Sequence, residues 1–338
     1  MKLVSYLKDG HDQLALFVDD YLYDTDFLHP DLPSSMMMFL QYWEDNFQLA
    51  QACDKAIKEG RIGKERGIPV EGLEMLAPVP FPPTCRDAYA FRQHVETARR
   101  NRDVPMIPEF DQFPVFYFTN PHSVQGPGEI LCMPDHLQKL DFEMEAAVVI
   151  SKPARNITAD EADEYIAGLM IMNDMSARLL QADEMKLNLG PAKGKDFATV
   201  LGPWLVTIDE LEAFEVPCKK GHTGKSWNLE MRCTVNGKQV SKGNLSDMDW
   251  TFAEIIERCA YGVTLLPGDV IGSGTVGTGC FLEINGTAKL NDAAYEEQWL
   301  QVGDVIEMEV DGLGKLTNKI VREDSELSLL EKKKGVAQ

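Results

Sequence analysis

Short runs of apolar residues, many of them alternating with polar ones, predict a chain built mainly of strands. Residues 2–7 and 13–18 read as two strands joined by a turn that contains Gly10. The stretch 36–58 carries Met and aromatic residues at helical spacing, and it predicts one helix begun by a serine pair and ended by Gly60. Its apolar stripe is typical of a buried face rather than of a cofactor site.

The remainder of the chain repeats the strand pattern, with turn signals between the runs. Asn236-Gly237 and Asn285-Gly286 carry the dipeptide most typical of a hairpin, and Asp311-Gly312 is a third hairpin candidate. Two helices are expected: one over 162–172, behind a capping box that begins at Thr158, and one over about 251–260. The apolar run 146–150 reads as a buried strand.

Four prolines within residues 78–83 mark the clearest internal boundary. Proline fixes φ and lacks the backbone donor that a helix or sheet requires, so this segment predicts a stiff, extended connector. We expect a small N-terminal domain over 1–77 that contains strands, and a catalytic domain over 78–338. Strands and hairpins outnumber helices without regular βαβ winding, which predicts an α+β, β-rich fold.

Charge narrows the classes of partner. The 338 residues include 54 acidic and 33 basic side chains, a formal net charge of −21. Such a charge repels nucleic acids and anionic membrane surfaces, so neither is expected as a partner.

The location of the protein is suggested by other features. No run approaches the roughly 20 apolar residues of a membrane span, and the first residues lack the apolar core of a secretory signal. Seven scattered cysteines, never spaced as CxxC, argue against a disulfide framework. We expect a cytoplasmic protein.

The segment Asp141–Ile150 carries the most chemical information. In a strand, residues i and i+2 face the same side, so Glu143 and Glu145 would present two carboxylates to one place beside a buried apolar run. Two such charges are costly in a low dielectric unless a cation or a proton neutralises them. The alternative is an ordinary strand end in solvent.

Two further acids carry this hypothesis forward. Asp174 follows an apolar stretch that we expect to be helical, and Asp87 lies just after the proline connector. Together with Glu143 and Glu145 they would form an all-oxygen site. Such a site suits Mg²⁺, Ca²⁺ or Mn²⁺ rather than zinc or copper.

An ordered set of motifs gives these acids a context: DxYxxRQH from Asp87, DxExEAAxxI from Asp141, NDxSAR from Asn173, GPxxGKxF from Gly190, then SGT and FLE up to Glu283. The set resembles the fumarylacetoacetate hydrolase family, in its long form with an N-terminal domain. The resemblance implies a catalytic domain of mixed β-sandwich roll type, a homodimer, and Mg²⁺ or Ca²⁺ as the metal.

The resemblance also implies roles for individual residues. Asp87, Glu143, Glu145 and Asp174 match metal ligands. His94 matches the general base and Glu283 the acid that orients it. The remaining matches are catalytic Lys195 and the substrate-binding residues Tyr89, Tyr117, Arg178, Gln181 and Thr275. Arg178 and Lys195 would offset about two negative charges left by four carboxylates and one divalent ion.

Two positions depart from long-form members. Met185 stands where some of them have a tyrosine, and Asp103 where they have an arginine, although Arg99, Arg100 and Arg102 lie close by. Both positions concern substrate binding rather than the metal or the base. The loop Gly272–Thr275 lacks the GxxxxGK[ST] or GxGxxG context of a nucleotide site.

The function expected from the resemblance is hydrolysis of a carbon–carbon bond in a β-diketone. The first hypothesis is fumarylacetoacetate to fumarate and acetoacetate, in tyrosine catabolism, with a metal-polarised carbonyl and a water activated by His94. The second is another reaction of the family on a 2-oxo acid through an enolate: acylpyruvate hydrolysis, oxaloacetate decarboxylation, isomerisation or dehydration. A non-catalytic metal-binding scaffold is the third.

Overall fold

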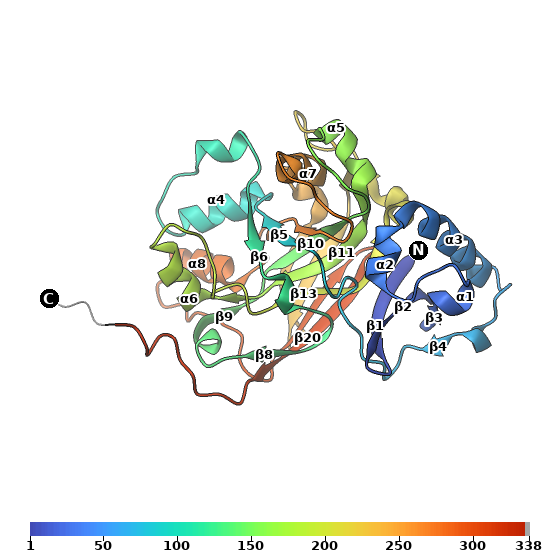
Figure 1. Ribbon diagram of the computed structural model, residues 1–338. Coiled ribbons are helices and arrows are strands. Elements are labelled where there is room, and N and C mark those ends of the chain that lie inside the picture. Colours follow the sequence, from blue (N-terminus) through green and yellow to red (C-terminus); the bar gives the residue numbers. More distant parts are fainter. Residues whose placement is uncertain (335–338) are drawn as a thin grey trace.

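The largest element of the computed structural model, which describes residues 1–334, is a sheet of eleven strands (Figure 1). Ten of them follow one another in the order β4 (Ile68–Pro69), β3 (Tyr21–Asp24), β2 (His11–Val18), β1 (Lys2–Lys8), β13 (Thr199–Thr207), β11 (Ile166–Asp174), β10 (Met144–Ile150), β18 (Val270–Gly272), β5 (Cys85–Ala88) and β6 (Phe116–Thr119). The short strand β7 (Val124–Gln125) pairs in parallel with β13.

A second sheet contains five strands, in the order β17 (Lys238–Asn244), β16 (Glu230–Val235), β19 (Val305–Val310), β20 (Gly314–Arg322) and β8 (Gly128–Cys132). The helices are α1 (Thr25–Leu28), α2 (Met36–Gln41), α3 (Trp43–Lys58), α4 (Arg92–Arg100), α5 (Ala159–Ala162), α6 (Arg178–Met185), α7 (Phe252–Ala260) and α8 (Phe281–Asn291). In Figure 1, α1, α2 and α3 accompany the N-terminal strands, whereas α4, α6 and α8 lie at the other side of the molecule. The β-rich α+β class is therefore confirmed.

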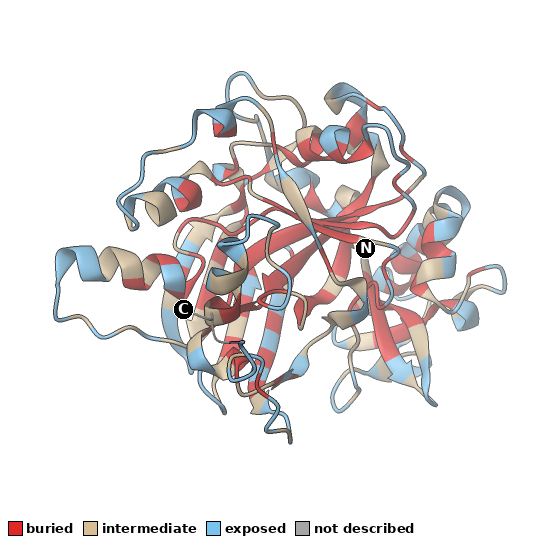
Figure 2. Cartoon of the chain, turned by 60° about the vertical axis from the view of Figure 1, so that its left-hand side comes forward, coloured by how far each residue is buried: buried red, intermediate tan, exposed pale blue. Residues whose placement is uncertain are grey.

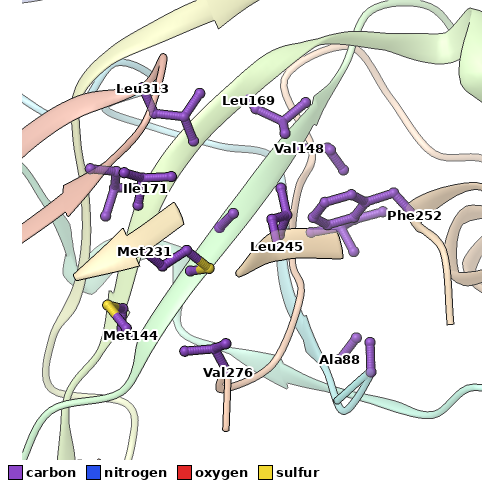
Figure 3. Close-up of a cluster of buried hydrophobic side chains, with 14 of the residues drawn as sticks. Ala88, Met144, Val148, Leu169, Ile171, Met231, Leu245, Phe252, Val276 and Leu313 are labelled. Atoms are coloured by element: carbon purple, nitrogen blue, oxygen red, sulfur yellow. The ribbon is translucent and has the colours of Figure 1, made fainter. Parts of the chain in front are cut away.

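The central strands are buried on both faces, as the red strands of Figure 2 show. The even-numbered residues of β10, from Met144 to Ile150, belong to a core cluster that also takes side chains from the five-stranded sheet and α7. Figure 3 shows Met144 and Val148 in this cluster together with Met231. The odd-numbered Ala147 and Val149 belong to a second cluster, which includes side chains of α2 and α3. This alternation follows from the two-residue period of a strand.

The N-terminal strands join the same sheet as the rest of the chain. β1 runs antiparallel to β13, with Lys2 opposite Val206 and Leu3 opposite Leu205. The two predicted N-terminal strands are confirmed, because β1 and β2 pair through a tight turn at Gly10. The domain division at residue 77 stays a prediction. Among residues 1–334, no helix is long and apolar enough to cross a membrane.

Three sequence predictions are corrected. The single helix over 36–58 is two helices, α2 and α3, because Tyr42 leaves the helical conformation between them. The helix expected over 162–172 ends as α5 at Ala162, and the following residues form strand β11. β11 is buried on both faces between β10 and β13, where an unbroken apolar run suits a strand.

The third correction concerns Asn285-Gly286, which lies inside α8 and forms no hairpin. Gly286 lies against Asn101, where an added Cβ would come within 2.5 Å of the side-chain nitrogen, and Asn285 donates to the carbonyl of Gln298. Both residues therefore serve helix packing. The hairpins at Asn236-Gly237 and Asp311-Gly312 are confirmed, as is the capped helix α7.

Candidate active site

Four carboxylates gather on one face of the large sheet. Asp87 lies on β5, Glu145 on β10, Asp174 at the end of β11, and Glu143 just before β10. One oxygen from each lies within 4.8 Å of the others, and all four residues are buried. The group that the sequence suggested therefore exists, and Glu143 and Glu145 are not a strand end in solvent. Asp174 ends a strand rather than the expected helix.

Strand β18 makes room for this group with a glycine. Gly272 stands between Asp87 of β5 and Ala147 of β10 in the strand register. A Cβ at Gly272 would come within 2.6 Å of Asp87 Oδ1 and 3.0 Å of Glu145 Oε2. Two residues on, the backbone nitrogen of Gly274 donates to both of these oxygens at 3.1 Å. The SGT segment thus supports the carboxylates with its backbone.

Burial raises the pKa of two of the carboxylates, so their charged forms are costly without a nearby cation. Burial and the charge of Asp174 raise the pKa of Asp87 to about 8. Burial and Asp87 raise the pKa of Glu145 well above its usual range. A buried carboxylate in this condition gains from a cation beside it, since the cation favours the charged form. A positive charge would therefore stabilise the ionised carboxylates most on the side of the group formed by Asp87 and Glu145.

The other side of the group already has cations. Lys195 Nζ donates to Glu143 and, at 2.6 Å, to Asp174 Oδ2. Arg178 Nη2 donates to Glu143 Oε1 at 2.8 Å. Burial alone would raise the pKa of Glu143, but Lys195 and Arg178 hold it below its usual range. The expected charge compensation by these two cations is present in the geometry.

A fifth carboxylate, to which no motif assigned a role, changes the charge balance of this group. Asp141 is fully buried; it accepts from Arg178 Nε at 2.8 Å and from the backbone nitrogens of Phe281 and Leu282. When all five carboxylates are ionised, as a bound cation would favour, Lys195 and Arg178 leave three negative charges rather than two. A divalent ion would still leave one, available to stabilise a protonated histidine nearby. The position of Asp141 at the start of the DxExE motif was the only sequence signal for it.

The donor set fits a hard divalent cation. All four carboxylates offer oxygen, the ligand type that Mg²⁺, Ca²⁺ and Mn²⁺ prefer. Asp174 Oδ1 is buried without a hydrogen-bond partner, so one lone-pair site in the group is unused by the protein. Such an atom is costly unless something positive contacts it. The residues present therefore suit a bound cation, although they do not identify which one.

His94 and Glu283 form a buried pair beside the carboxylates. His94 lies on α4 and Glu283 in the first turn of α8, and the two helices contact each other. His94 Nδ1 lies 2.7 Å from Glu283 Oε2, which also accepts from the backbone nitrogen of Thr278 at 3.0 Å. Because an ionised carboxylate only accepts, Nδ1 carries the proton in a neutral ring and Nε2 is the free base.

A cavity of about 750 Å³ opens beside these groups. Its lining includes most of the expected site residues: Asp87, Tyr89, His94, Tyr117, Glu143, Arg178, Gln181, Lys195 and Thr275. Tyr117 donates its hydroxyl to Asp174 Oδ2, and Thr275 donates to Glu145 Oε1 at 3.3 Å. The Tyr89 ring meets the His94 ring edge to face at 5.8 Å. The structure thus brings every sequence-predicted site residue into one region.

Met185 and Asp103, the two departures from the family pattern, line different cavities. Met185 lines the cavity at the end of α6. Asp103 lines a second cavity, which also takes Glu96 and Arg100. The cavity beside His94 takes Arg99 and Arg102 instead. Sequence reasoning could not decide which of these neighbouring charges faces the site, because that depends on how α4 ends.

Known proteins are similar to this chain over most of its length. Residues 84–321 match the family model described as fumarylacetoacetate (FAA) hydrolase C-terminal. The chain is 30% identical over 289 residues to a fumarylacetoacetase from Oryza sativa subsp. japonica, covering 71% of this chain and 66% of that protein. It is 28% identical over 329 residues to the mitochondrial oxaloacetate tautomerase Fahd2a of Rattus norvegicus, covering 95% and 92%.

Solved structures show the same fold. A fumarylacetoacetate hydrolase from Exiguobacterium antarcticum superposes with a TM-score of 0.68 at 22% identity, covering 96% of this chain and all of that one. A maleylpyruvate hydrolase from Sphingobium sp. SYK-6, solved with manganese(II) and pyruvate, gives 0.67 at 19% identity over 96% of this chain and all of its own. With a family model that spans more than half of its length, the chain belongs to the fumarylacetoacetate hydrolase family.

Proposed function

We propose that this chain is a divalent-cation-dependent enzyme that hydrolyses a carbon–carbon bond in a β-diketo acid, with fumarylacetoacetate as the first candidate substrate. The observation that carries the proposal is the His94–Glu283 pair at 2.7 Å, because His94 lines the same cavity as Asp87 and Glu143, two of the four clustered carboxylates. Hydrolysis of a β-diketone needs a base for water, a polarised carbonyl and a site for the negative charge that develops on the leaving group. This cavity offers residues for each need.

Asp87, Glu143, Glu145 and Asp174 would hold the cation, Mg²⁺ or Ca²⁺ by the family resemblance, with Mn²⁺ a further candidate because one structural neighbour contains it. When bound, such an ion supplies Lewis-acid polarisation of a carbonyl. His94 takes a proton from water at Nε2. Glu283 keeps the proton of the imidazole on Nδ1 and stabilises the imidazolium that forms.

The remaining polar residues would bind and orient the substrate. Gln181 Oε1 accepts from Arg178 Nη1 at 2.9 Å, which fixes the amide and leaves its nitrogen as a donor toward the cavity. Lys195 is buried against Glu143 and Asp174, which hold its charge in place for a developing oxyanion. Tyr89, Tyr117 and Thr275 complete the polar part of the wall.

A second candidate is another reaction on a 2-oxo acid, led by oxaloacetate tautomerisation. The observation that favours it is the similarity to rat Fahd2a, which extends over 95% of this chain at 28% identity. Acylpyruvate hydrolysis, decarboxylation, isomerisation and dehydration would use the same base and the same carboxylates. A non-catalytic scaffold would have no use for the His94–Glu283 pair.

A spectrophotometric assay tests the two candidates together. Purified protein is incubated with Mg²⁺, and again after EDTA, on fumarylacetoacetate, a short acylpyruvate and oxaloacetate. Loss of the β-diketone absorbance that requires the metal and prefers fumarylacetoacetate supports the first candidate. Faster keto–enol equilibration of oxaloacetate without β-diketone hydrolysis supports the second. No metal-dependent change with any of the three would contradict both.

Several sequence predictions remain open beside this proposal. A homodimer, a cytoplasmic location, a place in tyrosine catabolism, and the division into domains 1–77 and 78–338 are all proposals here. Sedimentation velocity at several concentrations tests the dimer. Limited proteolysis followed by mass spectrometry tests whether cleavage concentrates near the proline segment that ends at Pro83.

A further inference from the structure

The two helices that carry His94 and Glu283 begin without a side-chain cap of their own. Phe91 precedes α4 and Cys280 precedes α8, and neither side chain accepts a hydrogen bond from the helix that follows. α7 differs, because Thr251 directly before it caps its first turn. The first backbone nitrogens of a helix have no partner within it, so those of α4 and α8 need acceptors from elsewhere in the chain.

Asp141 supplies the acceptors for α8. Its Oδ1 accepts from the backbone nitrogen of Phe281 at 2.7 Å, and its Oδ2 accepts from that of Leu282 at 2.9 Å. Oδ2 also accepts from Arg178 Nε at 2.8 Å, and the carboxylate is fully buried. Phe281 and Leu282 directly precede Glu283, so Asp141 holds the backbone from which the Glu283 side chain extends.

Asp249 supplies the acceptor for α4. Its Oδ2 accepts from the backbone nitrogen of Arg92, the first residue of the helix, at 2.8 Å. Its own backbone nitrogen donates to the carbonyl of Ala90 at 2.9 Å, and Lys219 Nζ donates to its Oδ1 at 2.9 Å. Asp249 therefore holds the chain at two points, which lie two and four residues before His94.

His94 and Glu283 occupy the same place in their helices. Each is the third residue, so each lies in the first turn, where a helix frays when its backbone nitrogens lack acceptors. Their contact of 2.7 Å joins these two turns, and a hydrogen bond weakens as it lengthens or bends. A carboxylate at this end also interacts favourably with the helix dipole. A movement of either first turn would therefore change the geometry of the pair.

We infer that Asp141 and Asp249 are positioning residues for the His94–Glu283 pair, because each caps the first turn that carries one of its members. Both act through backbone nitrogens of another segment, since neither lines the cavity beside His94. The inference deepens the proposed function and rests on it only in calling His94 the base. The geometry itself is present without substrate, so it can be measured apart from turnover.

Nuclear magnetic resonance of protein labelled with ¹⁵N-histidine tests the geometry directly. The proton on His94 Nδ1, hydrogen-bonded to Glu283, should give a resonance far downfield, and its loss in His94→Ala assigns it. Asp249→Ala removes the acceptor for Arg92, whereas Asp249→Asn keeps one, since asparagine caps a helix as well as aspartate does. We expect the resonance to move upfield and kcat to fall about fivefold in Asp249→Ala, with both restored in Asp249→Asn.

The same replacement by asparagine should fail at Asp141. Its two oxygens serve Phe281 and Leu282 separately, so one of these nitrogens loses its acceptor whichever way the amide of Asp141→Asn turns. We expect the resonance and kcat to change in this variant as they do in Asp249→Ala. Ser35→Ala is the control, because it removes the cap of α2, a helix without a site residue, and it should leave both unchanged.

Three results would overturn the inference: an unchanged resonance in both Asp249→Ala and Asp141→Asn, an equal change in Ser35→Ala, and a failure of Asp249→Asn to restore the resonance. Asp249 is half-buried, so its variants test the inference even if Asp141→Asn does not fold. Thermal midpoints of all variants separate a loss of folding from a loss of position. The expected shifts in a protein that turns over no substrate would contradict the proposed function and leave this inference standing.

Discussion

Nδ1 of His94 lies 2.7 Å from Oε2 of Glu283, although 189 residues separate the two in the sequence. The contact joins α4 to α8, and both side chains are buried. The backbone nitrogen of Thr278 holds the same carboxylate oxygen at 3.0 Å. The base therefore has a fixed orientation before any substrate arrives, which is the condition under which a histidine acts efficiently on a bound water.

Replacing His94 tests the base directly. His94→Ala should lower kcat by about 10²–10⁴, because no other described side chain holds an unprotonated imidazole nitrogen at this place. Mg²⁺ affinity, measured by calorimetry, should stay within error, since the four carboxylates are untouched. His11→Ala, at an exposed position, serves as the control. Wild-type turnover in the His94 variant would remove it from the role.

Glu283→Gln separates orientation from the base itself. The amide keeps the shape of the carboxylate but loses its charge, so it no longer stabilises the imidazolium. We expect kcat to fall by about 10²-fold or more, with KM little changed, in steady-state kinetics. A rise in KM with normal kcat would instead assign Glu283 to substrate binding.

Glu145→Gln should act in opposite directions on the metal-free and metal-loaded protein. Burial and Asp87 raise the pKa of Glu145 well above its usual range, so the metal-free protein must either take up a proton there or bear the repulsion. The amide of Gln requires neither, so the thermal midpoint after EDTA should rise. The stabilisation gained on adding Mg²⁺ should shrink, with affinity lowered at least about tenfold. Differential scanning fluorimetry with and without metal measures both effects. Glu71→Gln, on the surface, should change neither midpoint.

Gly272→Ala should disturb the carboxylates without touching their chemistry. The added methyl group would come within 2.6 Å of Asp87 Oδ1 and 2.8 Å of Met172 Sδ. We expect weaker Mg²⁺ binding by calorimetry together with a far-ultraviolet circular dichroism spectrum like that of wild type. Gly63→Ala is a suitable control, because its methyl group would meet only the flexible side chain of Glu65. Unchanged affinity in Gly272→Ala would place the cation away from Asp87.

His136 predicts a pH dependence of stability. Burial and Lys193 lower its pKa from 6.5 to about 4, and its Nδ1 accepts from the backbone nitrogen of Met133 at 3.2 Å. The folded protein therefore prefers the neutral ring, so this contribution to stability is complete above pH 6.5 and is lost as the pH falls toward 4. In His136→Asn, which keeps an acceptor, the thermal midpoint should fall less steeply between pH 7 and pH 5. Parallel curves would contradict this assignment.

The sequence predicted which residues lie together better than it predicted the elements that carry them. The motifs from Asp87 to Glu283 carry chemistry that depends on residue type and order, and these survive any error in secondary structure. The stretch 162–172 was predicted to be a helix because a capping box precedes its apolar run, whereas residues 166–174 form β11, a strand whose apolar run shows no period because β10 and β13 bury it. The role of Asp141 and the direction of Arg99 and Arg102 depend on tertiary contacts that no local pattern records.

The pairing of β1 with β13 has a practical consequence for anyone who expresses part of this chain. A fragment trimmed to the residues matched by the family model, 84–321, would leave β13 without β1 on one edge and uncover its own side chains Leu201 and Leu205. An open strand edge with apolar side chains is a template for association between copies. Such a fragment should aggregate during recombinant production, even though it contains every residue proposed for catalysis.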